Sequence, residues 1–79
     1  MTDTLESLLA RNRTRRRLPS PEARKLLRER HGLSQDEVAS LVGTNRSTVS
    51  RWETGIRDPR GLTLTLYLEL LDRLAREPA

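Results

Sequence analysis

The chain has 79 residues, a formal net charge of +4, and neither cysteine nor phenylalanine. This length allows one small domain, and the lack of cysteine excludes disulfides, a thiolate nucleophile and a cysteine-based zinc site. No apolar run approaches membrane-spanning length and the polar N-terminus lacks the apolar stretch of a signal peptide, so we expect a cytoplasmic protein with no membrane partner.

Basic residues are concentrated in the first part of the chain. Residues 1–33 carry nine basic and four acidic side chains, whereas residues 34–61 carry four of each. Five of the basic residues form one short run: Arg11, Arg13, Arg15, Arg16 and Arg17. Such a run attracts phosphate, and we interpret residues 1–19 as a basic N-terminal arm that lies along DNA. The alternative is a solvated charge run that only aids solubility.

Residues 3–12 of this arm are ambiguous. Leu5, Leu8 and Leu9 have helical spacing, but their apolar face is narrow and needs a surface on which to dock. The arm is therefore expected to contain a short helix only if such a surface exists. Residues 18–21 (LPSP) then predict a linker, because two prolines disfavour continuous helix.

Residues 20–79 are expected to fold as a helical domain. Ser20 suits the N-cap and Pro21 the first position of a helix that runs to about residue 31. Its inner face and edges are expected to carry Ala23, Leu26, Leu27 and Arg30. Gly32 follows and ends this helix.

The segment 33–55, LSQDEVASLVGTNRSTVSRWETG, predicts two short helices that flank a turn. Ser34 and Glu37 have the spacing of a capping box at the start of the first helix. Gly43 suits the turn because glycine adopts positive φ at low cost. Asn45 is the expected cap of the second helix, with Thr44 as the alternative.

The second of these helices has one apolar side and one polar side. Val49 and Trp52 are expected to face inward. The polar side chains that remain outside are Arg46, Ser47, Ser50 and Arg51. A short polar helix of this kind is what insertion into a DNA major groove requires.

The last element is a choice between strand and helix. Residues 62–68 (LTLTLYL) alternate as a strand would, but the chain offers no partner strand and an isolated strand is unstable. We therefore predict a helix from about 61 to 76 with two leucine rows, one of them surplus to a single core contact. The surplus row is Leu62, Leu66 and Leu70. It points to a self-association surface on this helix, and the homodimer interface is assigned to Leu66, Leu70 and Leu74, with residues 3–10 as the second candidate. The predicted fold class is all-α, a compact four- to five-helix bundle.

The stretch 22–61 resembles the Cro/C1-type (Xre) helix-turn-helix family. The residues that carry the resemblance are Gly32-Leu33-Ser34-Gln35, Val38-Ala39, Gly43, Ser47-Thr48-Val49-Ser50, Trp52-Glu53 and Gly55. Segment 57–76 is similar to the tail of antitoxin-like members, in which a Pro-x-Gly sequence leads into one leucine-rich helix. The resemblance implies a helix-turn-helix that binds double-stranded DNA.

Several residue roles follow from this resemblance. Gln35 is implied to touch a phosphate and to brace the recognition helix, and Arg28 to pair with Glu53. The positions that face bases and adjoining phosphates are Asn45, Arg46, Ser47, Ser50 and Arg51. We place three further residues against the DNA backbone: Thr44, Arg57 and Arg60.

These features predict a sequence-specific regulator of transcription, most simply a repressor that acts as a homodimer on an inverted repeat. The alternative is an antitoxin or adaptor that binds a partner protein, such as a toxin, and autoregulates. Recombination accessory proteins share the scaffold as well. We expect no enzyme activity, because the chain has no nucleophile–base set and no phosphate-binding glycine loop. We also expect no cofactor and no metal, because carboxylates are not suitably spaced around His31, the sole histidine.

Overall fold

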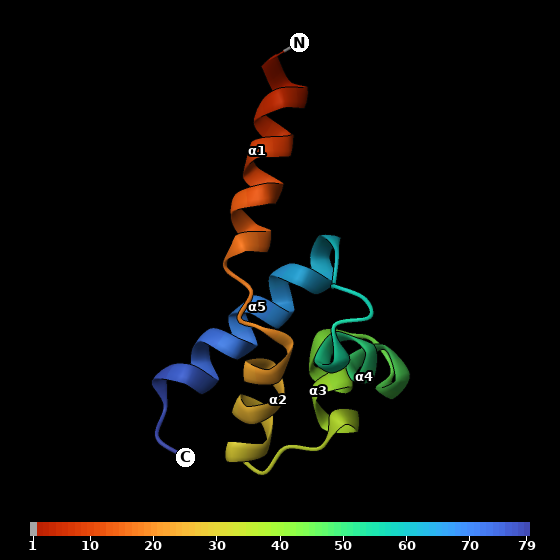
Figure 1. Cartoon of the computed structure of the whole chain (residues 1–79), viewed down its shortest axis with the longest axis vertical. Helices are drawn as coiled ribbons and strands as arrows, with labels where there is room; N and C mark the ends of the chain where they lie inside the picture. The colour runs from red at the N-terminus through yellow and green to blue at the C-terminus, as the bar shows by residue number, and fades with distance from the viewer. Residues whose placement is uncertain (1) are drawn as a thin grey trace.

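The computed structural model describes the backbone of residues 2–79, and the side chains of these residues except 2, 3, 11, 12 and 14–16. Within this range the helices are α1 (Thr2–Arg16), α2 (Pro21–Arg30), α3 (Gln35–Val42), α4 (Arg46–Thr54) and α5 (Gly61–Arg76), and there is no strand. Helices α2 to α5 form one body, from which α1 projects (Figure 1). The predicted all-α fold class is confirmed.

The ends of the helices follow the expected local signals. The Ser20 hydroxyl accepts a hydrogen bond from the Ala23 amide at 3.2 Å. Ser34 and Glu37 form a complete capping box at α3, and Gly43 ends that helix with φ of 77°. Asn45, rather than Thr44, caps α4, because its side-chain oxygen accepts the Thr48 amide at 2.9 Å.

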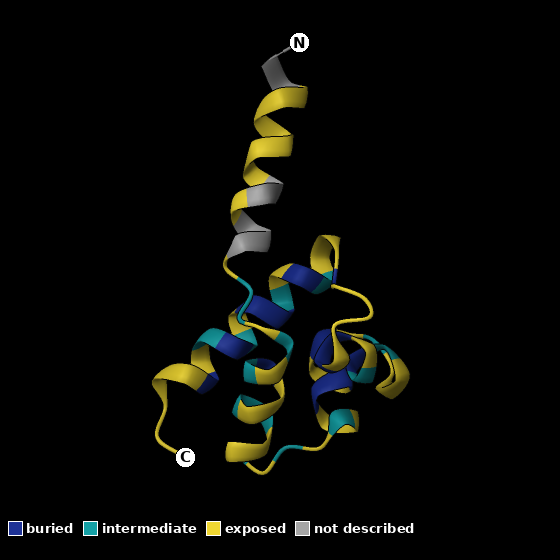
Figure 2. Ribbon diagram, in the orientation of Figure 1, coloured by how far each residue is buried: buried dark blue, intermediate teal, exposed yellow. Residues whose placement is uncertain are grey.

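The core is built around two aromatic rings. Trp52 of α4 and Tyr67 of α5 lie with their ring centroids 4.6 Å apart. Their neighbours in the core cluster are Val38, Ala39, Val42, Val49 and Leu71. The buried residues of α5 recur at helical spacing, which explains why the alternating 62–68 segment is a helix (Figure 2).

One expectation for α2 is wrong. Leu26 is 64% exposed, whereas Arg24, two positions earlier, is buried. Leu27 is half-buried against the core, and Arg24 and Arg28 share one side of the helix because they are four residues apart. The face that packs on α4 and α5 therefore carries guanidinium groups where the sequence suggested a leucine.

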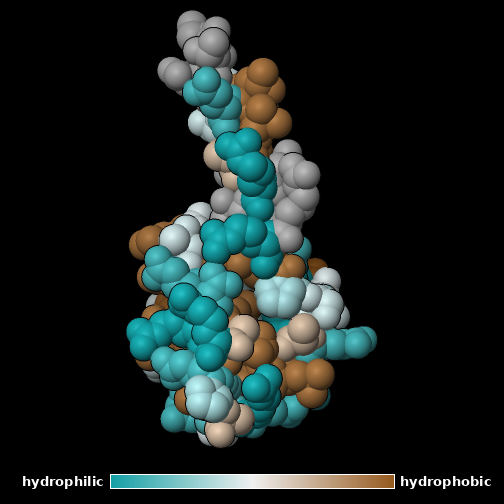
Figure 3. Space-filling model, turned by 90° about the vertical axis from the view of Figure 1, so that its left-hand side faces the viewer, coloured by the Kyte–Doolittle hydropathy of each residue, from teal (hydrophilic) through white to brown (hydrophobic). Residues whose placement is uncertain are grey.

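The N-terminal arm is more regular than expected. Helix α1 continues through the arginine run to Arg16, because residues 2–16 contain no glycine or proline and arginine favours helices. The side chains of Arg11, Arg15 and Arg16 lie outside the described residues. Leu5, Leu8 and Leu9 are exposed, and Figure 3 shows hydrophobic side chains gathered on one side of the projecting helix.

Two polar contacts hold the ends of the linker and of α2 to α5. After α1, the Arg17 guanidinium lies 2.8 Å from the Asp72 carboxylate of α5. At the end of α2, Nε2 of His31 lies 2.8 Å from the Leu74 carbonyl oxygen. Because a carbonyl only accepts, this His31 nitrogen donates the hydrogen bond.

An ion pair between Arg28 and Glu53 lies at the polar centre of the body. The guanidinium meets the carboxylate twice, Nε to Oε2 at 2.6 Å and Nη2 to Oε1 at 2.8 Å. Nη1 of Arg28 also donates to the Leu33 carbonyl at 2.9 Å, and the Gln35 amide donates to Glu53 Oε1 at 3.1 Å. The pair therefore joins α2, the start of α3 and α4.

The Glu53 carboxylate is charged despite its burial. Burial alone raises the pKa of a carboxyl group, but the hydrogen bonds from Arg28 and Gln35 outweigh it and leave the pKa of Glu53 lowered. Folding therefore favours ionised Glu53.

The Glu53 charge also acts on Tyr67. Together with burial it raises the pKa of Tyr67, whose hydroxyl is buried without a hydrogen-bond partner in the described part of the chain.

We predict that the ion pair makes stability depend on acid pH. Because the folded-state pKa of Glu53 is lowered, its contribution is present above the ordinary carboxyl pKa and is lost as pH falls through the folded value. Glu53→Gln should cost about 2–4 kcal/mol at pH 7. Between about pH 5 and pH 3, its free energy of unfolding should fall less than that of the wild type.

Urea unfolding at several pH values measures both effects. Glu37→Gln is the matched control, because Glu37 also has a lowered pKa but is exposed, and a glutamine at this position still completes the capping box. Equal stability of wild type and Glu53→Gln at pH 7 would contradict the role given to the pair.

Candidate nucleic-acid interface

Helix α4 exposes the polar side that the sequence predicts. Val49 and Trp52 are buried, whereas Arg46, Ser47 and Arg51 are exposed. Ser50 is half-buried between these two sides. The burial of Trp52 against Tyr67 makes it a packing residue of this helix.

Most of the predicted base-facing residues lie together. A shallow hollow of about 450 Å³ is lined by Gln35, Arg46, Ser47, Ser50 and Arg51. Its wall combines planar guanidinium groups, which can grip guanine through two hydrogen bonds, with short hydroxyl groups that allow close approach. The arrangement can therefore bind the polar edges of bases and the adjoining phosphates.

Gln35 and Asn45 are engaged within the protein. Gln35 is the first residue of α3, and its amide donates to Glu53 of α4 at 3.1 Å. The Asn45 side-chain oxygen accepts both the Thr48 amide and, at 3.0 Å, the Thr48 hydroxyl. Gln35 therefore helps to hold α4 against α3, whereas Asn45 fixes the start of α4.

A second hollow lies beside the start of α5. It has a volume of about 230 Å³, and its lining includes Thr44, Thr48, Arg57, Arg60 and Thr63. Arg57 and Arg60 are exposed, and the N-terminus of α5 receives no side-chain cap. Thr44, Arg57 and Arg60, the three residues predicted to meet the DNA backbone, thus share one surface. This surface can bind phosphate, because helix N-termini and arginines both attract anions.

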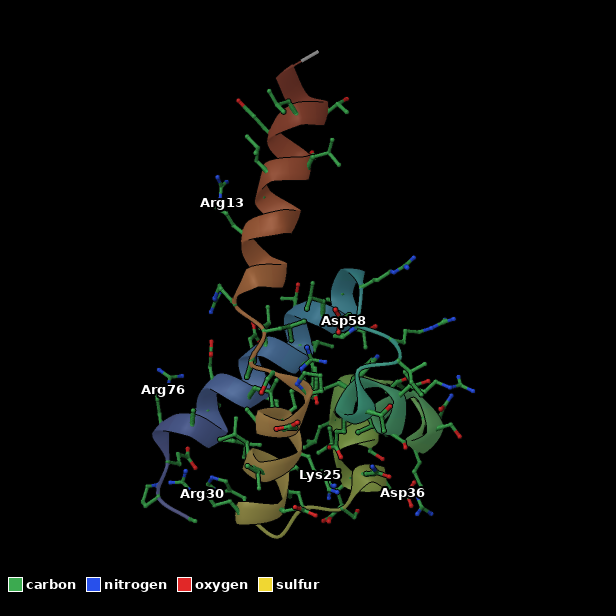
Figure 4. All side chains as sticks on the ribbon, viewed as in Figure 1. Arg13, Lys25, Arg30, Asp36, Asp58 and Arg76 are labelled. Atoms are coloured by element: carbon green, nitrogen blue, oxygen red, sulfur yellow. The ribbon has the colours of Figure 1, made fainter. Side chains whose placement is uncertain are left out.

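The described part of the arm does not join this surface. Arg13 is exposed on α1 and lies far from α4, as Figure 4 shows. Arg17 is paired with Asp72 of α5, so its positive charge is compensated within the protein. The other arginines predicted for the arm are Arg11, Arg15 and Arg16, whose side chains lie outside the described part of the chain.

The leucines assigned to a dimer interface, and Leu62 before them, differ in exposure along α5. Leu62 is 72% exposed, Leu66 and Leu70 are half-buried, and Leu74 is only 7% exposed. Residues four apart are offset by about 40° around a helix, so Leu74, which lies three such steps after Leu62, reaches the core side. Leu74 therefore packs within its own chain, which corrects its assignment to an interface.

Sequence reasoning missed Arg24, which is 4% exposed. Its Nε donates to the Pro19 carbonyl at 2.8 Å, and its Nη1 donates to the Trp52 carbonyl at 2.8 Å. The same Nη1 lies 3.1 Å from the Asp58 carboxylate. Its place one turn before Arg28 was the available signal, because residues four apart share a helix face.

The described residues contain no cluster of three or more histidine, aspartate or glutamate side chains that could hold a metal ion. In the same part of the chain, no helix is both long and apolar enough to cross a membrane.

Comparison with known proteins identifies the family. The helix-turn-helix family profile matches residues 25–76, which include α3, α4 and the hollow between them. No curated protein and no solved structure matches the chain significantly. The profile match covers more than half of the chain and contains the surface described above. The chain therefore belongs to the Cro/C1-type (Xre) helix-turn-helix family of DNA-binding transcription regulators.

Proposed function

We propose that this protein is a sequence-specific repressor that binds an inverted-repeat operator as a homodimer. The observation that carries the proposal is the hollow on the outer side of α4, lined by Gln35, Arg46, Ser47, Ser50 and Arg51. In this proposal the polar side of α4 enters the major groove and reads base edges. In this proposal the bound protein occludes a promoter and so represses transcription.

In this proposal, the two arginines of α4 and the residues of the second hollow make different kinds of contact with DNA. Arg46 and Arg51 supply the strongest contacts in the major groove, because each has a fork that suits guanine. Thr44, Arg57 and Arg60 contact the backbone and fix the register of α4 along the duplex. Base contacts thus specify the site, whereas phosphate contacts supply affinity that depends on salt.

We predict that Arg46→Ala/Arg51→Ala weakens binding to the DNA upstream of its own gene at least about 30-fold, from about 1–3 kcal/mol for each bidentate contact. Fluorescence anisotropy with unrelated competitor DNA measures this loss. Arg30→Ala/Arg76→Ala is the matched control, because it removes the same charge from two exposed positions. Both lie on the opposite side of the molecule from Asp36 of α3, and so away from the proposed DNA surface (Figure 4). Equal binding by both double variants would refute specific readout by α4.

The basic arm is proposed to follow the DNA phosphates outside the major groove. We predict that removal of residues 1–16, which keeps the Arg17–Asp72 pair, weakens binding and flattens its salt dependence. Four arginines are removed, so the slope of log K against log salt should change by up to about 3–4. Titrations between low and physiological salt measure the slope. An unchanged slope would mean that the arginine run does not contact DNA.

The homodimer is proposed to form through the outward side of α5. Leu62, Leu66 and Leu70 are spaced four residues apart, so they form one continuous exposed-to-half-buried row. A second copy would bury this row, and pairing would double the contact with DNA. Exposed leucines on α1 are the competing surface.

We predict that Leu62→Glu converts the dimer to a monomer in light scattering, because a buried charge opposes pairing. Leu62 is the most exposed residue of the row, so this change should leave the thermal unfolding of the domain nearly unaltered. Leu8→Glu on α1 is the matched control. Dissociation by Leu8→Glu alone would assign the interface to α1 instead.

A further inference from the structure

Arg24 is a buried cation of α2 that reaches the end of α4 and the loop beside the second hollow. It is 4% exposed, and its guanidinium makes three contacts with three separate segments. These segments are the linker before α2, the end of α4 and the loop that leads to α5. A single side chain therefore connects the parts of the chain that surround the recognition helix.

The contact with α4 satisfies a carbonyl group that the helix itself cannot use. Trp52 lies in the last turn of α4, where carbonyl oxygens lack an amide partner four residues later. Nη1 of Arg24 donates to this oxygen at 2.8 Å. In the next turn of the chain, the Arg57 amide reaches back to the Arg51 carbonyl at 3.4 Å. The loop thus leaves α4 at a position that Arg24 helps to fix.

The contact with Asp58 has an electrostatic consequence. Asp58 lies between Arg57 and Arg60 in the sequence and lines the same hollow as these two arginines. Its place beside the start of α5 is labelled in Figure 4. Its carboxylate is about half exposed, and its partner is Nη1 of Arg24 at 3.1 Å. A carboxylate without this partner would repel a phosphate held by the neighbouring arginines. Arg24 supplies the compensating charge from inside the protein.

We propose that Arg24 is a positioning residue for DNA binding. It holds the loop 56–60 against the end of α4 and neutralises Asp58, so that Arg57 and Arg60 can meet the DNA backbone. This inference rests on the proposed backbone contacts of those two arginines. Lysine is not equivalent, because its single ammonium group cannot match three acceptors in the fixed geometry of a guanidinium.

The experiment compares Arg24→Met, Asp58→Asn and the double variant. Binding is measured by anisotropy, across a series of salt concentrations, on the upstream fragment and on an unrelated duplex of equal length. Arg24→Met should weaken binding about tenfold on both duplexes and reduce the salt slope by about 2, because Arg57 and Arg60 would each cease to neutralise one phosphate. Asp58→Asn alone should bind at least as tightly as the wild type, because it removes a negative charge near phosphate.

The double variant separates the electrostatic role from a merely structural one. If Arg24 neutralises Asp58, then Arg24→Met/Asp58→Asn should bind at least about threefold more tightly than Arg24→Met. Arg30→Met is the matched control on the same helix, since it removes an exposed positive charge and should leave the salt slope nearly unchanged. A double variant that binds no better than Arg24→Met would overturn the neutralising role.

A measurement without DNA tests the positioning role. Hydrogen exchange of the Arg57 amide should accelerate in Arg24→Met and stay slow in Arg30→Met, while amides in the core of α5 remain protected in both. General unfolding would instead accelerate all of these amides, in which case Arg24→Lys, which retains the charge, replaces Arg24→Met. Unchanged exchange at Arg57 in the folded variant would overturn the proposal.

These outcomes are distinct from failure of the proposed function. Loss of specific readout appears as equal binding of the two duplexes by the wild type and by Arg46→Ala/Arg51→Ala. The Arg24 readouts, which are the salt slope on either duplex and the exchange of one amide, do not require sequence specificity.

Discussion

The position of the recognition helix depends on the buried ion pair between Arg28 and Glu53. Helix α4 has nine residues, a length at which an isolated helix is not stable in water. The pair ties it to α2 through two short hydrogen bonds and to α3 through the Gln35 amide. Removal of either partner would leave an uncompensated charge inside the body, so both residues have to be present together.

Two arginines of α2, the buried Arg24 and the half-buried Arg28, contact neighbouring residues of α4. Arg24 binds the backbone carbonyl of Trp52, and Arg28 binds the side chain of Glu53. Both contacts fall in the C-terminal half of the helix, whereas Arg46 and Ser47 lie at its exposed beginning. The helix is therefore anchored at one end, and the other end remains available to a ligand. Polar contacts provide this anchor in a small core that contains no phenylalanine.

Local signals predicted much of this structure, and tertiary contacts decided the rest. Ser20, the Ser34–Glu37 box and Asn45 fix helix starts within a few residues, so they can be recognised in the sequence. The burial of Arg24 and the exposure of Leu26 could not be recognised in the sequence. They depend on where Asp58 and the Trp52 carbonyl lie after folding. Composition alone treats every arginine as surface charge. Two of those on α2 instead pair inside the protein.

The shortness of α4 limits how much sequence one chain can distinguish. Nine residues span about 13 Å, which corresponds to about four base pairs of B-DNA. Four base pairs specify about eight bits of information, so such a site recurs by chance about every 256 positions. Two symmetric half-sites raise this to about 16 bits, or one chance occurrence in about 65,000 positions. The length of a single helix thus limits the number of sites in a genome that this fold can distinguish.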